Sequence, residues 1–299
     1  MNLAVDIKGI HFKNPIIAAS GTFGFGEEYN ELYDVSVLGG ICSKGLTLHP
    51  KEGNAGIRIY ETPSGMMNSV GLQNPGIEAF RNEGIRNMRK FDTVLIANMG
   101  GHSMDDYIKG AELLSESDID MLELNISCPN VKSGGMAFGI KASVAQAVVA
   151  EVRKVCRKPL IVKLSPNAEN IVDMALACEA AGADALSLVN TFQAMAIDIH
   201  RRKPVFENVY AGLSGSAIRP IALRMVHSVC KQVHIPVIGI GGIATAEDIL
   251  AFMMAGARAV QIGTVNFSRP LAGQELCRQL ETLCLKEGIR DITEIIGVI

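Results

Sequence analysis

The sequence predicts an α/β fold, and within that class a (β/α)8 barrel. Short runs rich in β-branched residues alternate with longer amphipathic stretches along the 299 residues, which is the pattern of parallel strands joined by helices. Several runs are apolar almost throughout, as strands buried on both faces are. Glycine is frequent, at 30 residues, and aromatic residues make up only 5%. This composition suits many tight turns between strands and helices around one large core.

Eight runs qualify as strands, which is the number that closes such a barrel. They are Pro15–Ser20, Leu38–Ser43, Thr93–Asn98, Ile119–Asn125, Leu160–Ser165, Ala185–Asn190, Val237–Ile240 and Ala259–Ile262. Helical patterns fall between most of them, near Gly76–Lys90, Ser103–Glu116, Ile140–Val155, Asn170–Ala181, Ala217–Cys230 and Ala246–Ala255. A doubly wound parallel sheet is the second architecture considered, but no G-x-G-x-x-G sequence follows a strand.

No linker or low-complexity segment divides the chain, so residues 1–299 are expected to form a single domain. The segment LAVDIKGIHF at residues 3–12 predicts a short hairpin across the bottom of the barrel. The segment Thr191–Gly215, after the sixth strand, is too long for a simple loop. An excursion of this kind usually serves a site or a partner.

Charge and cysteine usage exclude several functional classes. Lys and Arg number 28 against 31 Asp and Glu, for a net charge of −3, so a nucleic-acid partner is not expected. No window of about 18 apolar residues predicts a membrane span, and the N-terminus lacks a signal-peptide pattern. The seven cysteines are scattered without a C-x-x-C motif, and the six histidines show no metal-ligand spacing. We therefore expect a cytoplasmic protein with free thiols and no metal site or iron–sulfur cluster held by this chain.

Glycine-containing dipeptides follow the last two predicted strands. Gly241-Gly242 follows the seventh strand and Gly263-Thr264 follows the eighth. Glycines let an anion approach backbone N–H groups, and the loops after these two strands are the usual phosphate site of this fold. The alternative is a pair of ordinary tight turns, but the position of both pairs favours phosphate binding.

Two lysines lie in or at the end of apolar strands, where an ammonium group is costly unless it meets a partner. They are Lys44 and Lys163. Strand alternation puts Glu123 and Asn125 on one face of the fourth strand, and Lys163 with Ile161 and Ser165 on one face of the fifth. An inward contact between Glu123 and Lys163 is therefore a hypothesis. The alternative is that the lysines extend outward to solvent. Five asparagines also fall at or after strand ends, which suggests recognition of a polar heterocycle: Asn68, Asn98, Asn125, Asn130 and Asn190.

Cys128 directly follows the fourth strand and precedes Pro129, and the residues up to Gly139 are rich in Gly, Asn and Ser. This composition suggests a lid. A thiol placed there can act as a base, nucleophile or ligand, and nearby lysines would lower its pKa from about 8.5. Most cysteines are small buried hydrophobic residues, and the other six are interpreted in that way.

The strand-end motifs resemble those of the dihydroorotate dehydrogenases, flavin enzymes of pyrimidine biosynthesis. The resemblance runs from about Ile7 to Gly263, and its most specific parts are NSVGLQN at 68–74 and NISCPN at 125–130. Cys rather than Ser at position 128 resembles class 1. The motifs GLQNPG and GLSGSAIRPIALRMV resemble the 1B type, which passes electrons to NAD through a separate iron–sulfur flavoprotein subunit.

By position, the resemblance implies an FMN cofactor and a dihydroorotate or orotate ligand. FMN would contact Ser20, Lys44, Gly45, Asn98, Asn125, Lys163, Val189, Gly215, Gly241, Gly242, Gly263 and Thr264. The substrate would contact Lys44, Asn68, Ser69, Val70, Gly71, Leu72, Asn125, Asn190 and Thr191, with Cys128 as the base. FAD and an iron–sulfur cluster would belong to the partner, in an assembly of two catalytic and two electron-transfer chains.

Four other functions remain open on the sequence. A class 1A enzyme would use fumarate and need no partner, and a dihydropyrimidine dehydrogenase-like barrel would act on dihydrouracil. A phosphate-sugar isomerase or aldolase barrel would hold no flavin. A non-catalytic barrel subunit is the fourth, although the many polar groups at one end of the predicted barrel argue against it.

Overall fold

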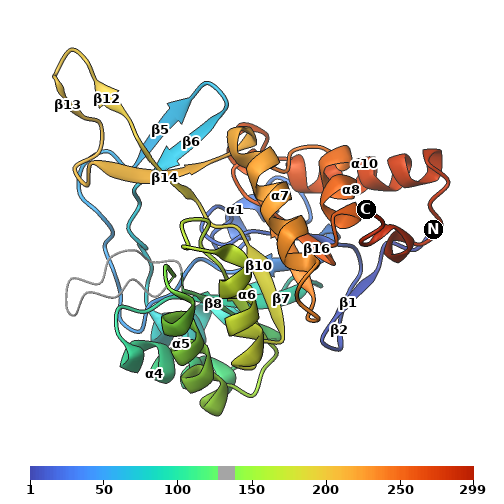
Figure 1. The fold of residues 1–299 in the computed structure, drawn as a ribbon, viewed down its shortest axis with the longest axis horizontal. Helices are drawn as coiled ribbons and strands as arrows, with labels where there is room; N and C mark the ends of the chain where they lie inside the picture. Colours follow the sequence, from blue (N-terminus) through green and yellow to red (C-terminus); the bar gives the residue numbers. More distant parts are fainter. Residues whose placement is uncertain (127–138) are drawn as a thin grey trace.

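The computed structural model describes residues 1–126 and 139–299, and its centre is a closed barrel of eight parallel strands (Figure 1). In chain order the barrel strands are β3 (Ile16–Ala18), β4 (Gly40–Cys42), β7 (Val94–Met99), β8 (Met121–Asn125), β9 (Leu160–Lys163), β10 (Ala185–Leu188), β15 (Val237–Ile240) and β16 (Ala259–Ile262). Each pairs in parallel with its neighbours, and β16 pairs with β3 to close the ring. All eight predicted strands and the (β/α)8 fold are confirmed.

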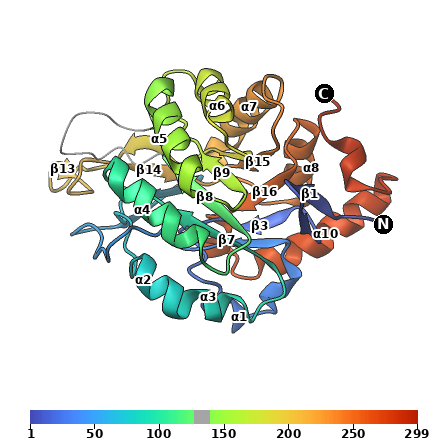
Figure 2. The ribbon, with the colours of Figure 1, turned by 90° about the horizontal axis from the view of Figure 1, so that it is seen from below.

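Helices surround this barrel, as Figure 2 shows from below. The longer ones are α4 (Met104–Ser115), α5 (Ala142–Val155), α6 (Ile171–Ala180), α7 (Arg219–Cys230), α8 (Ala246–Met254) and α10 (Ala272–Lys286). The predicted helix at 76–90 is divided into α2 (Ile77–Ala79), a π-helical turn (Phe80–Gly84) and α3 (Ile85–Met88). Two short helices, α1 (Glu27–Asn30) and α9 (Val265–Ser268), and the long α10 were not predicted.

Side-chain caps begin several of these helices. Ser103 accepts a hydrogen bond from Asp106 N at the start of α4, and Asn170 caps α6. Thr245 and Asp248 form a reciprocal capping box at α8. Because each cap satisfies backbone N–H groups that lack a helical partner, it determines where the chain leaves the barrel and the helix begins.

The predicted hairpin closes the amino-terminal end of the barrel. Strands β1 (Val5–Ile7) and β2 (Ile10–Phe12) pair antiparallel, and Phe12 is fully buried against Gly40 at the start of β4. The ammonium of Lys8 in the turn lies 3.1 Å from the carboxylate of Asp184, which directly precedes β10. The functional end is therefore the opposite one, where the strands terminate.

The excursion after the sixth barrel strand forms part of a small sheet that projects from the carboxyl end of the barrel (Figure 1). Its strands are β11 (Phe192–Met195) and β14 (Tyr210–Ser214), with β5 (Ile59–Thr62) and β6 (Gly65–Asn68) from the connection after β4, in the order β11-β14-β6-β5. A second hairpin, β12 (Ile197–Asp198) with β13 (Lys203–Pro204), extends beyond it. The excursion was predicted, but its pairing with residues 59–68 was not.

Within residues 1–126 and 139–299, no helix combines the length and apolar character needed to span a membrane.

Candidate active site

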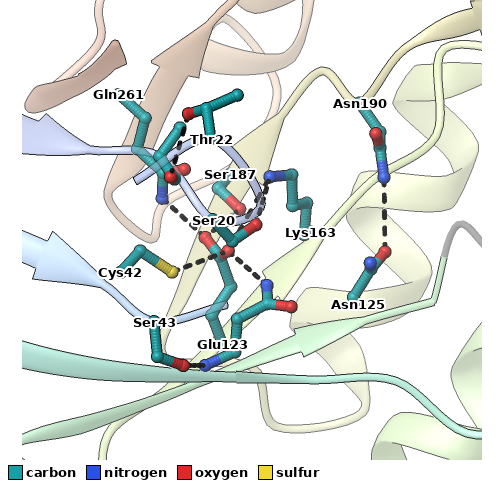
Figure 3. Close-up of polar contacts among 12 residues, drawn as sticks. Ser20, Thr22, Cys42, Ser43, Glu123, Asn125, Lys163, Ser187, Asn190 and Gln261 are labelled. Atoms are coloured by element: carbon teal, nitrogen blue, oxygen red, sulfur yellow. Dashed lines mark hydrogen bonds and ion pairs between the residues drawn. The ribbon is translucent and has the colours of Figure 1, made fainter. Parts of the chain in front are cut away.

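A polar layer replaces part of the apolar core inside the barrel. Its centre is Glu123 on β8, which is completely buried. One carboxylate oxygen accepts hydrogen bonds from Cys42 Sγ at 3.3 Å and Asn98 Nδ2 at 2.7 Å. The other accepts from Ser187 Oγ at 2.8 Å and Gln261 Nε2 at 2.6 Å (Figure 3). These four donors satisfy the carboxylate in its ionised form.

The layer follows the geometry of the barrel. Cys42, Glu123, Ser187 and Gln261 come from the second, fourth, sixth and eighth barrel strands. Inward side chains of alternate strands form one layer of a (β/α)8 barrel, and such layers are usually filled by Val, Ile and Leu. Burial and the neighbouring Glu123 carboxylate raise the pKa of the Cys42 thiol well above its ordinary value, so Cys42 acts here as a neutral donor.

Lys163 lies next to this layer, toward the carboxyl ends of the strands. Its Nζ is 3.9 Å from Glu123 Oε1 and donates a hydrogen bond to Ser20 Oγ at 3.2 Å. Lys163 is 5% exposed and Glu123 0%, which decides between the two alternatives for this lysine. The inward contact predicted from strand alternation is confirmed, and Lys163 does not extend outward to solvent.

Asn98 leaves an acceptor available beside Gly45. Its Nδ2 is bound to Glu123, whereas Oδ1 is buried and has no hydrogen-bond partner within the described residues. A Cβ on the neighbouring Gly45 would lie 3.0 Å from this oxygen. Gly45 therefore keeps space open next to Asn98 Oδ1, a buried acceptor that a hydrogen-bond donor of a ligand could satisfy.

Lys44 stands at the same end of the barrel. Its Nζ lies 3.5 Å from the Gly21 carbonyl oxygen, and burial lowers the pKa of its ammonium group. Lys44 is half buried, and among the described residues no carboxylate lies within ion-pair distance of its ammonium group. Such a cation is suited to an anionic ligand. The two predicted lysines thus have different surroundings, because only Lys163 has a carboxylate close by.

The segment 68–72 reaches over this opening. Asn68, the last residue of β6, donates a hydrogen bond to Gly212 O at 3.4 Å. Asn54 Nδ2 donates to both the carbonyl oxygen and the hydroxyl oxygen of Ser69, each at 3.1 Å. Gly71 and Leu72 have positive φ angles of 76° and 57°. This turn directs the Leu72 side chain toward Gly45, where a Cβ would lie 3.4 Å from Leu72 Cδ2.

Asn125 and Asn190 meet across the opening. Asn190 Nδ2 donates to Asn125 Oδ1 at 3.4 Å (Figure 3). Thr191 follows directly, and its carbonyl oxygen accepts from Asn167 at 3.3 Å. Val189, which is buried, joins these residues to the end of β10. The predicted asparagines at 98, 125 and 190 are therefore gathered at one end of the barrel.

Three glycines form a narrow cradle beside the opening, at the start of α7. Gly215, Gly241 and Gly242 have positive φ angles of 98°, 138° and 70°. A Cβ on Gly242 would lie 2.6 Å from Gly215 O, and one on Gly215 would lie 2.7 Å from the Gly65 Cα. Only glycine fits these positions. Gly263 and Thr264 end the adjacent strand, and Thr264 Oγ1 donates to Ser214 Oγ at 2.8 Å.

Cys128 and Asn130 lie outside the described residues, so their predicted roles stay predictions. Sequence reasoning missed the contribution of Cys42, Ser187 and Gln261, all of which bind Glu123. Their signal was weak: each is a single small or polar residue within an otherwise apolar strand. Among the described residues, no three His, Cys, Asp or Glu side chains are grouped so that they could hold a metal ion.

Comparison with known proteins places this geometry in a family. Residues 2–284 match the family described as dihydroorotate dehydrogenase. The chain belongs to the dihydroorotate dehydrogenase family. It is 59% identical over 295 residues to "Dihydroorotate dehydrogenase B (NAD(+)), catalytic subunit" of Petrotoga mobilis, covering 99% of this chain and 98% of that protein.

Other members of the dihydroorotate dehydrogenase family carry the same name. Those of Alkaliphilus oremlandii and Thermoanaerobacter pseudethanolicus are 53% and 52% identical to this chain, each over 99% of this chain and 98% of the relative. The resemblance that the strand-end motifs indicated, including its B type, is confirmed by these relatives.

Proposed function

We propose that this protein oxidises dihydroorotate to orotate in pyrimidine biosynthesis, as the FMN-containing catalytic subunit of an NAD-linked enzyme. The observation that carries the proposal is the buried Lys163 ammonium at the mouth of the barrel. At the same end, Asn98 Oδ1 has no hydrogen-bond partner among the described residues, and Gly45 keeps space open next to it. A cation and an acceptor on one side of a slot suit the polar edge of an isoalloxazine ring. The family match and the names of the relatives support the reaction.

The described residues fit an FMN cofactor at both of its ends. The glycine cradle at 215, 241 and 242, with Gly263 and Thr264, suits a phosphate, because backbone N–H groups at a helix start favour an anion. The ring would lie against Ser20, Lys44, Gly45, Asn98, Asn125, Lys163 and Val189. When bound, the flavin supplies the acceptor for the hydride that leaves C6 of dihydroorotate.

The substrate would lie between the ring and the segment 68–72. The Lys44 ammonium would bind the carboxylate, since it is half buried and lacks a carboxylate of its own among the described residues. Asn68, Asn125 and Asn190 would donate to and accept from the amide-like edges of the pyrimidine, with Ser69, Val70, Gly71, Leu72 and Thr191 completing the contact. Cys128 would remove the proton from C5, as a general base.

The electrons would leave through a second chain. An iron–sulfur cluster and FAD are proposed to belong to this partner, in an assembly of two catalytic and two electron-transfer chains. The words "catalytic subunit" and "NAD(+)" in the names of the relatives support a partner and this acceptor. A cytoplasmic location is proposed as well, since the six described cysteines are free thiols, as is usual in a reducing compartment.

An anaerobic visible spectrum tests the central proposal. The purified chain should be yellow and should bleach on addition of dihydroorotate. A yellow protein that stays oxidised would support the flavin but contradict dihydroorotate as the substrate. Bleaching by dihydrouracil instead would favour a dihydropyrimidine dehydrogenase-like enzyme. A folded protein that binds no FMN on reconstitution would overturn the proposal.

The electron acceptor needs its own experiment. Turnover with NAD+ should require the partner chain, and the isolated chain should not reduce fumarate. Reduction of fumarate by the isolated chain, at a rate unaffected by the partner, would instead indicate the class 1A reaction.

A further inference from the structure

Glu123 and Lys163 are the only charged side chains that the described residues place inside the barrel. The third buried charged group, Asp248, lies outside it at the start of α8, where it binds Arg219 at 2.6 Å. The Glu123 carboxylate is surrounded by uncharged donors from β4, β7, β10 and β16. Its negative charge is therefore balanced by Lys163.

The partners of Glu123 hold its side chain in one position. The amide groups of Asn98 and Gln261 present N–H to the carboxylate, and the hydroxyl of Ser187 donates to the same oxygen as Gln261. All four hydrogen bonds run toward the carboxylate, so each of its two oxygens accepts two of them. Bonds to four strands besides its own leave the side chain little freedom.

The distance between Lys163 Nζ and Glu123 Oε1 shows what kind of contact the two groups make. At 3.9 Å the two groups attract each other electrostatically, but no hydrogen bond joins them. The ammonium has three N–H donors, and Ser20 takes one of them at 3.2 Å. Glu123 thus balances the charge of Lys163 without accepting a hydrogen bond from it. The N–H donors of Lys163 that do not bind Ser20 are left for a ligand at the mouth of the barrel.

We propose that Glu123 is a positioning residue that balances the charge of the Lys163 ammonium and keeps it directed at the flavin ring. The inference rests on the proposed function, because the ring is the group that Lys163 would face. Glu123 is completely buried and would act on the flavin through Lys163. The alternative role is purely structural: a carboxylate that fastens five barrel strands together.

Sulfite binding to the FMN-loaded protein separates these roles without any turnover. Sulfite forms a bond from its sulfur lone pair to N5 of oxidised flavin, and the negative charge that appears near N1 and the C2 oxygen is stabilised by a cation there. The dissociation constant of sulfite therefore reports a charged, correctly directed Lys163. It is measured by the loss of flavin absorbance in the wild type and in Lys163→Met, Glu123→Gln and the double variant.

The proposal requires the two substitutions to be coupled. Lys163→Met and Glu123→Gln should each raise the sulfite dissociation constant by about tenfold, whereas Glu123→Gln in the Lys163→Met background should raise it no further. Ser187→Ala is the matched control, since it removes one hydrogen bond from the same carboxylate and leaves its charge. We expect less than about a twofold change in that variant.

Each other outcome is decisive. If Lys163→Met weakens sulfite binding but Glu123→Gln does not, or Glu123→Gln weakens it equally in both backgrounds, the positioning role is overturned and the proposed function stands. Tighter binding in Glu123→Gln would mean that the carboxylate acts through its own field, which also overturns the inference. Loss of FMN from every form, the wild type included, would instead defeat the proposed function.

A second variant covers the possibility that Glu123→Gln does not fold, which circular dichroism of the apoprotein would reveal. Glu123→Asp keeps the charge but draws the carboxylate back toward β8 and away from Lys163. It should raise the sulfite dissociation constant by an amount between those of the wild type and Lys163→Met. A wild-type value would contradict the positioning role.

Discussion

The ammonium of Lys163 and the carboxylate of Glu123 lie 3.9 Å apart inside the barrel, on adjacent strands, and both side chains are almost completely buried. A buried ion pair seldom stabilises a fold more than apolar residues of similar volume would, because both ions lose their hydration. Glu123 lies in a layer that other barrels fill with Val, Ile and Leu, with Lys163 next to it, and this position of the pair therefore indicates a function. In the proposed function, the Lys163 ammonium supplies a fixed positive charge at the mouth of the barrel.

Removal of one member of this pair should destabilise the apoprotein strongly. Lys163→Met leaves the Glu123 carboxylate buried without a counter-charge, for which we expect a loss of about 3–5 kcal/mol in the free energy of unfolding. The double variant with Glu123→Gln should regain much of this loss, because no charge is then left buried. Urea denaturation of the apoproteins of the wild type, Lys163→Met, Glu123→Gln and the double variant, all at one pH, measures both effects. Equal stability of the wild type and Lys163→Met would show that the pair is not energetically coupled to folding.

The glycine cradle predicts a specific loss of FMN. Gly242→Ala places a methyl group 2.6 Å from Gly215 O at a φ of 70°, so the cradle must distort and FMN affinity should fall at least about tenfold. Gly288→Ala is the control, since its φ is 72° but nothing lies within 4 Å of the new methyl group. Fluorescence titration of FMN into the apoproteins measures the affinity. Similar losses in both variants would trace the effect to backbone strain alone.

Lys44 predicts how orotate affinity depends on pH. Burial lowers the pKa of this ammonium in the free protein, whereas a bound carboxylate would favour the charged form. Orotate affinity should therefore be highest below the lowered pKa and fall as the pH rises through it toward the ordinary lysine value of about 10.4. Spectral titration of the flavin with orotate between pH 7 and 10 measures this dependence.

Lys44→Met is the reference for that titration. This variant should bind orotate more weakly at pH 7, and the part of the pH dependence due to Lys44 should disappear. A pH profile of unchanged shape in Lys44→Met would rule out Lys44 as the group that binds the carboxylate.

The base proposed for the reaction predicts a rate effect without a binding effect. Cys128→Ala should retain FMN but slow flavin reduction by dihydroorotate by about 10²–10⁴-fold, which is the usual contribution of a general base. Anaerobic stopped-flow absorbance measures the rate. Cys277→Ala is the control: this thiol lies on α10 near Val37 O at 3.6 Å, and burial raises its pKa to about 12. Wild-type reduction by Cys128→Ala would eliminate the base assignment.

The parts of the fold that could be predicted are those that leave a pattern within a short stretch of sequence. The eight barrel strands could be found because buried parallel strands are short, apolar and β-branched. The helix at 76–90 was predicted as continuous, but a π-helical turn at Phe80–Gly84 interrupts it. Periodicity averages over a window and does not detect one extra residue in a turn. The pairing of β14 with β6 was also missed, because segments so far apart in sequence leave no local signal.

The candidate site divides in the same way. Strand alternation led to the hypothesis of an inward contact between Glu123 and Lys163, and the motifs at 68–74 and 125–130 indicate the family. Cys42, Ser187 and Gln261 could not be assigned to the Glu123 carboxylate from the sequence. Each belongs to a different strand, and which strands face each other across a barrel depends on its closure and stagger.

The sequence by itself determined the barrel, the family and the strand ends at which the chemistry gathers, because alternation, turn residues and short motifs are local properties. Only the tertiary structure decided that Lys163 points inward to a buried Glu123 and that Gly215 and Gly242 form one cradle. It also decided that Asn98 Oδ1, beside Gly45, has no hydrogen-bond partner in the part of the chain that the structure describes. Those relationships arise when strands and loops distant in sequence are brought within a few ångströms by barrel closure. Distance and burial, rather than residue type, then determine which polar groups balance one another and which remain available for a ligand.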